Sequence, residues 1–219
     1  MLKNYEEKQV EIREKIKKLL QGLIDANKVV LKSLDDCDKK KIEDAKKFVT
    51  NMSKKTSNVD NETIATLALH QPEAKDLREL VSFLKITNEI LRASYNTRNF
   101  INGFKEVCED IDLKVVKEYA IPMQKATLKA LTGAYDMICT DCIDESRDIY
   151  NKVLINENKT DDMYDLIEKD LLKDKSGTEF KKIHEMLGAL RKSEKIADRA
   201  LGIASLLLYS KVGGELHQL

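Results

Sequence analysis

The chain has 219 residues, which suffices for one large domain or for two helical domains of about 110 residues each. Charged residues make up 35% of it, whereas it holds only 8 Gly, 2 Pro and no Trp, a composition that favours long amphipathic helices and argues against sheets. Lys plus Arg and Asp plus Glu both number 38, so the formal net charge is zero. The chain therefore lacks the basic surplus that is typical of proteins that bind nucleic acid.

The sequence lacks the features of an exported or membrane-inserted protein. No apolar run approaches the roughly 18 residues that cross a bilayer, and Met1–Tyr5 does not begin a signal peptide. We therefore expect a cytoplasmic protein that is peripheral to a membrane at most.

The four cysteines, Cys37, Cys108, Cys139 and Cys142, are too few and too scattered for a disulfide framework. Cys139 and Cys142 form a lone C-x-x-C motif. A zinc site would need a second Cys/His pair, and a thioredoxin-like motif would need a βαβ context, and neither is present. We interpret these two thiols as helix residues packed in a core.

The common catalytic motifs are also missing. The sequence has no P-loop, no G-x-S-x-G, no H-E-x-x-H and no G-x-G-x-x-G, and its three histidines have no ligand spacing between them. We therefore expect a protein that is not an enzyme.

The first half of the sequence predicts three helices. Apolar residues from Ile12 to Leu34 recur in steps of three and four, which predicts an amphipathic helix. Asp35–Asp36 can cap a second helix, which Asn58–Asn61 is expected to interrupt. His70–Pro72 predicts a stop and a restart, because proline is tolerated in a first helical turn but not in mid-helix. A third helix is predicted from Leu77 towards Phe104.

The second half repeats this arrangement. A long helix is predicted over Ile111–Leu131, with a kink at Pro122. Another is predicted over Asp144–Leu172. Ser176–Glu179 has the form of a capping box, and the helix that it opens should run to Gly213–Gly214, a natural C-terminal stop.

Three long helices followed by three more indicate an internal duplication. The halves are residues 1–107 and 108–219, and no flexible linker separates them. The sequence therefore predicts an all-α protein made of two sequence-related three-helix bundles that pack side by side as one body.

Carboxylates fall on the inner face of the last predicted helix. Its apolar seam passes through Leu187 and Leu190 and resumes at Leu201, and steps of three and four between them land on Glu194 and Asp198 or its neighbour. A pair of like charges four residues apart costs stability, and near a core it needs compensation.

A second ladder of carboxylates lies on the preceding helix, at Asp161 and Asp165 with Glu157 one turn earlier. Antiparallel helices could bring the two ladders together, as in metal sites of helical bundles. Oxygen ligands suit Mg, Mn, Ca or ferric iron. The alternative is that these are solvated charges in a chain already rich in them.

Three stretches of the chain resemble motifs of the PhoU family, regulators of bacterial phosphate uptake. Gln71–Arg78, followed by Leu84-Lys85-Ile86, is similar to the family's Q-P-x-A-x-D-L-R…L-K-I stretch. Ser193–Ala200 resembles its E-R-I-G-D motif, and Thr160–Asp165 resembles its D-D-x-V-D helix. With the two three-helix repeats, the similarity covers essentially the whole chain.

The resemblance implies a metal centre in the second repeat. Members of the family bind iron, zinc or other metals through such acidic pairs, and magnesium or manganese would also suit them. Carried over to this chain, the candidate ligands are Asp161, Asp165, Glu194 and Asp198.

The first repeat departs from the family pattern. Leu91–Tyr95 stands where E-R-I-G-D should be, and the other acidic pair falls near Val49 and Ser53, which carry no charge. We therefore expect one metal site in the C-terminal half and none in the N-terminal half.

The family role implied is regulatory. Such proteins contact the ATP-binding subunit of a phosphate ABC transporter and a membrane histidine kinase, and a homodimer is a further option. Three alternatives remain: a helical metal-binding or metal-storage protein, a metal-dependent hydrolase that uses the same carboxylates, and an accessory regulator of a different, non-ABC phosphate transporter.

Overall fold

The computed structural model describes residues 2–111, 113–172 and 177–214, and within these ranges the chain is helical and has no strand. The expected all-α fold is confirmed. The long helices are α1 (Leu2–Ser33), α3 (Met52–His70), α4 (Ala74–Val107), α6 (Ile121–Cys139), α7 (Ile143–Leu172) and α8 (Gly177–Val212). No helix in the described ranges is long and apolar enough to cross a membrane.

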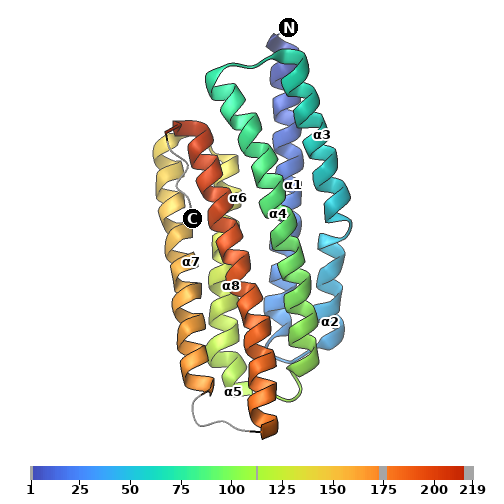
Figure 1. Ribbon diagram of the computed structural model, residues 1–219, viewed down its shortest axis with the longest axis vertical. Coiled ribbons are helices and arrows are strands. Elements are labelled where there is room, and N and C mark those ends of the chain that lie inside the picture. Colours follow the sequence, from blue (N-terminus) through green and yellow to red (C-terminus); the bar gives the residue numbers. More distant parts are fainter. Residues whose placement is uncertain (1, 112, 173–176, 215–219) are drawn as a thin grey trace.

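The long helices form two neighbouring groups (Figure 1). Helices α1, α3 and α4 pack on one another, and so do α6, α7 and α8. Contacts of α4 with α8 and of α1 with α6 join the groups. The division into repeats 1–107 and 108–219 stays a prediction, although the grouping of the helices follows it.

The hydrophobic core is shared between the two groups. One cluster contains Leu20 of α1 and Ile86 of α4 together with Leu201 of α8. The other contains Phe100 of α4 together with Met123 of α6, and all five side chains are at most 2% exposed. Because both clusters draw on both groups, the two groups are packed into a single body.

The break in the second predicted helix lies earlier than expected. The short helix α2 (Lys39–Asp44) is followed by a 3₁₀ turn and then by α3. The chain breaks at Asn51, which has the left-handed φ of 55° that asparagine tolerates, whereas Asn58–Asn61 is helical throughout. The cap also differs from the prediction of Asp35–Asp36, since the Asp38 side chain accepts a hydrogen bond from the Lys41 N–H at 2.9 Å.

The predicted stop and restart before α4 is present. Helix α3 ends at His70, and Gln71 closes it in a left-handed conformation with its N–H bonded to Leu67 O. Helix α4 begins at Ala74, two residues beyond Pro72.

The kink expected at Pro122 takes the form of a widened turn. Helix α5 (Leu113–Val115) continues into a π-helical turn, in which the Ile121 N–H bonds to Val116 O, five residues earlier. Proline has no N–H to give, and its ring collides with the carbonyl four residues earlier, so the helix widens just before it.

The last two helices agree with the prediction over their described residues. Helix α7 covers the predicted Asp144–Leu172, and α8 ends where Gly213 and Gly214 adopt φ of 76° and 86°. The predicted capping box begins at Ser176, which lies outside the described residues.

The pairing and the exposure of the cysteines differ from the prediction. Cys37 and Cys108 form a disulfide with their Cα atoms 5.7 Å apart, which links the segment after α1 to the end of α4. Their separation of 71 residues gives no sequence signal for the pairing. Cys139 and Cys142 are exposed, so their interpretation as core residues was wrong. The reason is that Cys139 is the last residue of α6 and Cys142 lies in the connection to α7, so neither is in the middle of a helix.

Candidate metal centre

Helix α8 carries two carboxylates on a face that is otherwise apolar. Leu190, Ala197 and Leu201 on this helix are buried, and Glu194, between them in the sequence, is only 3% exposed. Asp198, one turn later, is half-buried. The helical spacing therefore located the buried carboxylate correctly, because residues three and four apart share a helix face.

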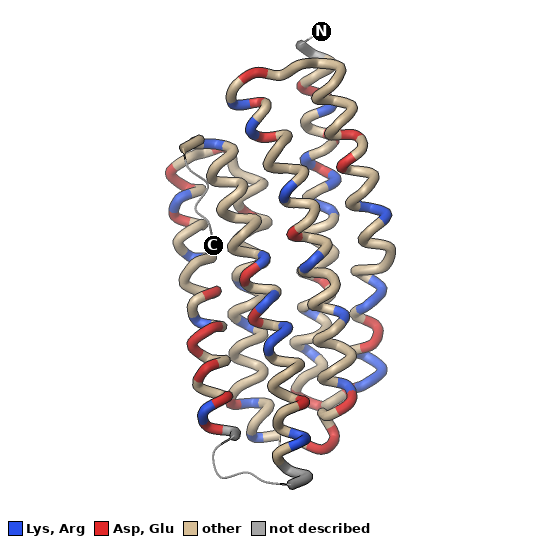
Figure 2. Tube along the Cα trace, in the orientation of Figure 1, with Lys and Arg blue, Asp and Glu red and all other residues tan. Residues whose placement is uncertain are grey.

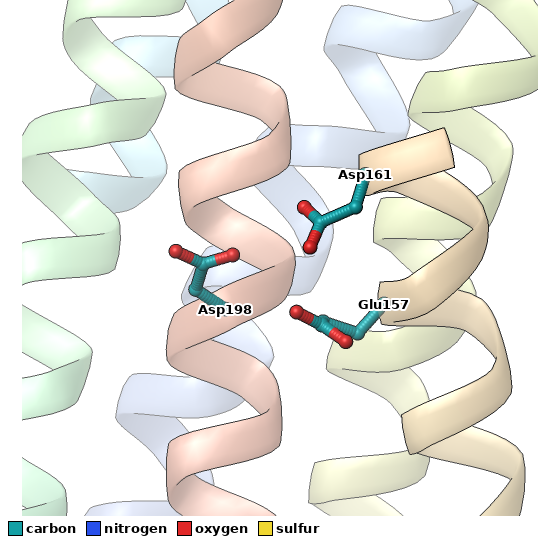
Figure 3. Close-up of side chains that lie close together, drawn as sticks. All are labelled: Glu157, Asp161 and Asp198. Atoms are coloured by element: carbon teal, nitrogen blue, oxygen red, sulfur yellow. The ribbon is translucent and has the colours of Figure 1, made fainter. Parts of the chain in front are cut away.

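Helix α7 adds two more carboxylates. Glu157 and Asp161 extend from α7 towards Asp198 on α8 (Figure 3). One oxygen atom from each of the three lies within 4.8 Å of the other two. Four residues apart on α7, Glu157 and Asp161 lie on one face of that helix.

Asp165, the fourth predicted ligand, lies apart from this group. It is exposed, and at this level of α7 the neighbouring Tyr164 ring lies under the guanidinium of Arg191, at 4.8 Å. Because the helices run antiparallel, the part of α8 that carries Asp198 faces α7 one turn earlier, and Glu157 takes the place predicted for Asp165. Asp161, Glu194 and Asp198 do come together around one groove.

The carboxylates line an open groove with a volume of about 580 Å³. Its walls come from α7 and α4, and its floor comes from α8. Figure 2 shows acidic residues along α7 beside a stretch of α8 where acidic and basic residues alternate. Charged residues of both signs line the groove: Glu157, Asp161, Glu194 and Asp198, with Lys85, Glu89, Lys195 and Arg199.

Basic side chains partly neutralise the carboxylates. Lys195 Nζ lies 2.8 Å from Glu194 Oε1 and 2.7 Å from Asp198 Oδ2. Arg199 Nη2 lies 3.9 Å from Asp198 Oδ2, and its Nη1 donates to Glu89 Oε2 on α4 at 3.0 Å. Ion pairs thus lie along α8 and join it to α4.

Burial and mutual repulsion make three of these carboxyls harder to ionise. Burial, and then the charges of Asp161, Asp198 and Glu194, raise the pKa of Glu157 to about 7. Burial and the charge of Asp198 raise the pKa of Asp161. Burial also raises the pKa of Glu194, against the opposing hydrogen bond from Lys195. A bound cation would stabilise the ionised form of each group.

One oxygen of Glu194 has no hydrogen bond. Glu194 Oε2 is buried, and although Arg191 Nε lies 3.2 Å away, its N–H is not directed at that oxygen as in a hydrogen bond. A buried carboxylate oxygen normally has a partner. The donor set is all-oxygen, so these residues fit a hard or intermediate cation such as Mg, Mn, Fe or Zn.

A buried polar network fixes the segment of α8 that precedes Glu194. Ser193 Oγ donates to Gln124 Oε1 on α6, and Gln124 Nε2 donates to Asn27 Oδ1 on α1, both at 2.8 Å. Thr127 lies 3.0 Å from Ser193 Oγ, and all four residues are at most 1% exposed. The sequence prediction missed this network, whose signal is polar residues at apolar-phase positions of the helices.

Among the described residues of the first half, no comparable group of acidic side chains comes together. Tyr95 and Leu91 occupy the positions expected for acidic ligands, and Tyr95 is 51% exposed. Among the residues that the structure describes, the group on α7 and α8 is the one set of three His, Cys, Asp or Glu side chains close enough to share an ion.

Comparison with known proteins finds similarity to PhoU proteins. Residues 10–102 match the sequence model of the PhoU domain. Over this segment the chain is similar to the PhoU family. It is 20% identical over 204 residues to the phosphate-specific transport system accessory protein PhoU homolog 1 of Methanothermobacter thermautotrophicus, a match that covers 91% of this chain and 90% of the relative.

Two solved PhoU structures share the fold. The phosphate transport system regulatory protein PhoU from Streptococcus pneumoniae has a TM-score of 0.79 at 19% identity, over 98% of this chain and 100% of that one. PhoU from Pseudomonas aeruginosa has a TM-score of 0.72 at 19% identity, over 97% and 98% of the two chains. The PhoU fold thus extends over both halves, whereas the domain match ends before the carboxylates of α7 and α8.

Proposed function

We propose that this chain regulates phosphate uptake from the cytoplasm by binding the ATPase subunit of a phosphate ABC transporter and its sensor histidine kinase. The observation that carries this proposal is the PhoU domain over residues 10–102 within a PhoU fold that covers nearly the whole chain. The relatives named above are accessory or regulatory proteins of phosphate transport systems, which supports the same role here. The lack of the common catalytic motifs favours a binding protein over an enzyme.

We also propose that Glu157, Asp161, Glu194 and Asp198 hold one or more metal ions in the groove. The buried Glu194 Oε2, which accepts no hydrogen bond, and the raised pKa values of the carboxyls in the groove support this. A bound ion would join α7 to α8 as a structural cross-link and present a positive charge to a partner. Iron, zinc, magnesium and manganese are the candidate metals.

Deletion of the gene in its own organism tests the regulatory role. In phosphate-rich medium, the deletion strain should take up phosphate faster and express phosphate-starvation genes that the parent keeps off. Re-expression of the wild-type chain should restore repression. Unchanged uptake and unchanged expression after deletion would rule this role out.

A direct binding measurement tests the partner. The purified chain is immobilised, and the ATPase subunit of the phosphate ABC transporter from the same organism is passed over it, with the ATPase of an unrelated ABC transporter as control. Selective binding supports the proposal. Binding to a different phosphate transporter instead would assign the chain to the alternative of a non-ABC accessory regulator.

The groove favours a second candidate, a helical metal-binding protein whose role is independent of phosphate. The two functions differ in their dependence on phosphate. A deletion strain with altered metal content and normal phosphate uptake would support the second candidate against the first.

A further inference from the structure

The ammonium group of Lys195 lies among the carboxylates of the groove. We call Glu157, Asp161, Glu194 and Asp198 the acidic cluster. Its Nζ donates to Glu194 Oε1 at 2.8 Å and to Asp198 Oδ2 at 2.7 Å. Adjacent residues on a helix point about 100° apart and do not normally face each other. Glu194 and Lys195 are adjacent, so their contact requires both side chains to turn towards the same place above α8.

Lys195 differs from the other cations around the groove. Arg191 also lies over the Tyr164 ring, and Arg199 also binds Glu89 of α4. Both hydrogen bonds of Lys195, by contrast, go to carboxylates of the cluster. Within the described part of the chain, it is the cation whose hydrogen bonds are confined to this cluster.

We infer that Lys195 is an internal counter-ion, which occupies the cation position of the groove and must leave before a metal ion can bind there. The inference rests on the metal site proposed above. Lys195 contacts one oxygen of Glu194 and one of Asp198, and its positive charge beside both carboxylates repels an incoming metal ion. The lysine side chain is flexible and is 35% exposed, so its ammonium can move into water when an ion arrives.

The counter-ion has a consequence for regulation. The metal-free groove is kept in an ion-paired state, and metal binding is weakened by the free energy needed to break the two contacts of Lys195. The residue therefore sets the metal concentration at which the groove is filled. When a metal ion displaces Lys195, the released ammonium group becomes a mobile positive charge at the rim of the groove.

Metal titration of purified variants tests this inference. Zn²⁺ and Mn²⁺ are titrated separately into chelator-treated protein, and the Kd is measured by competition with a chromophoric chelator. Lys195→Met should tighten Kd by at least about tenfold, because it removes both the competitor and its repulsion of the ion. Lys195→Arg keeps the charge and should stay within about threefold of wild type.

Lys85→Met is the matched control. Lys85 lines the same groove and makes no ion pair in the described part of the chain, so its loss removes an equal charge without freeing a carboxylate. Its Kd should change by less than about threefold. An equal tightening in both variants would mean that general charge sets the affinity and would overturn the inference.

The outcomes separate this inference from the metal site itself. Metal binding by wild type with an unchanged or weaker Kd in Lys195→Met would overturn the counter-ion and leave the site in place. Binding by Lys195→Met but not by wild type would support the counter-ion and remove the metal from the proposed function of the native chain. Failure of both proteins to bind would overturn both.

A measurement on wild type tests the inference without relying on variants that could misfold. In protein labelled with ¹⁵N-lysine, the Lys195 amine signal should lie apart from those of free lysines and move to their position when metal is added. Metal binding without this change would also contradict the inference.

Discussion

Arg199 on α8 and Glu89 on α4 form an ion pair across the edge of the groove, with 3.0 Å between Nη1 and Oε2. Their side chains are 27% and 21% exposed, so the pair is largely withdrawn from water. Gly202 lies next to it, and a Cβ at this position would lie 3.6 Å from Glu89 Oε2. The pair therefore connects the two halves of the chain beside the candidate metal centre.

Neutralising this pair should lower stability. We expect Glu89→Gln to reduce the free energy of unfolding by about 1 kcal/mol, because the neutral amide no longer offers Arg199 an opposite charge at a partly buried site. A double-mutant cycle with Arg199→Met, measured by urea unfolding, gives the coupling. Glu11→Gln breaks the exposed pair with Lys8 and should cost less than about 0.5 kcal/mol. Additive effects of Glu89→Gln and Arg199→Met would contradict the prediction.

Disrupting the polar network beneath Glu194 should lower the stability of the fold more than neutralising this ion pair does. Gln124→Leu leaves Asn27 Oδ1 without a partner in the core and removes the acceptor of the Ser193 hydroxyl, so we expect a loss of roughly 2–3 kcal/mol. Thr132→Ala, at an exposed position of the same helix, should change stability by less than about 0.5 kcal/mol. Thermal and urea unfolding measure both variants. Equal stability of Gln124→Leu and wild type would mean that this network does not stabilise the fold.

Two helical glycines should respond in opposite directions to alanine. A Cβ on Gly22 would lie 2.8 Å from Phe48 O, a backbone atom that cannot move cheaply, so Gly22→Ala should destabilise by about 1–3 kcal/mol. A Cβ on Gly188 meets nothing within 4 Å. Gly188→Ala should therefore stabilise by roughly 0.5–1 kcal/mol through helix propensity. The melting temperature of Gly22→Ala should lie below that of wild type, and the melting temperature of Gly188→Ala should lie above it.

The stability of the metal-free protein should fall as pH rises. The pKa of Glu157 is raised to about 7 in the folded state, so the folded state binds this proton more tightly than the unfolded state does. The free energy of unfolding therefore decreases as pH rises from the ordinary value of 4.5 to about 7, and burial of Asp161 and Glu194 acts in the same direction. Melting in chelator between pH ~5 and ~8 measures the slope.

Replacing Glu157 identifies the source of this slope. Glu157→Gln should flatten the pH dependence, because the neutral amide removes the group that titrates. Asp165→Asn, on an exposed part of the same helix, should leave it unchanged. A slope that is the same in wild type and Glu157→Gln would show that the effect comes from other groups.

The periodic pattern predicted the helices well because an amphipathic helix repeats its apolar residues over many turns. It failed at single residues that break helices. Asn51 could break the second helix only in the context of its neighbours, and Asn58–Asn61, which looked equally disruptive, remained helical. Pro122 was an exception, since its missing N–H disturbs any helix that continues through it.

The candidate site was predicted on α8 more accurately than on α7. Glu194 and Asp198 are fixed relative to the apolar seam of their own helix, so their phase could be read from the sequence. The choice between Glu157 and Asp165 depends on how far α7 is shifted along α8. That shift is set by packing between helices, which no pattern within one helix contains.

Metal binding by matched variants tests the central claim most directly. Wild type, Asp161→Asn/Asp198→Asn and Asp165→Asn are purified without metal, titrated with Zn²⁺ and Mn²⁺, and compared for ions bound per chain. We predict that wild type and Asp165→Asn bind at least one of these metals equally well and that the double variant, with its helical content unchanged, loses that binding. Equal binding by all three proteins, or no binding by wild type, would contradict the account of the acidic groove.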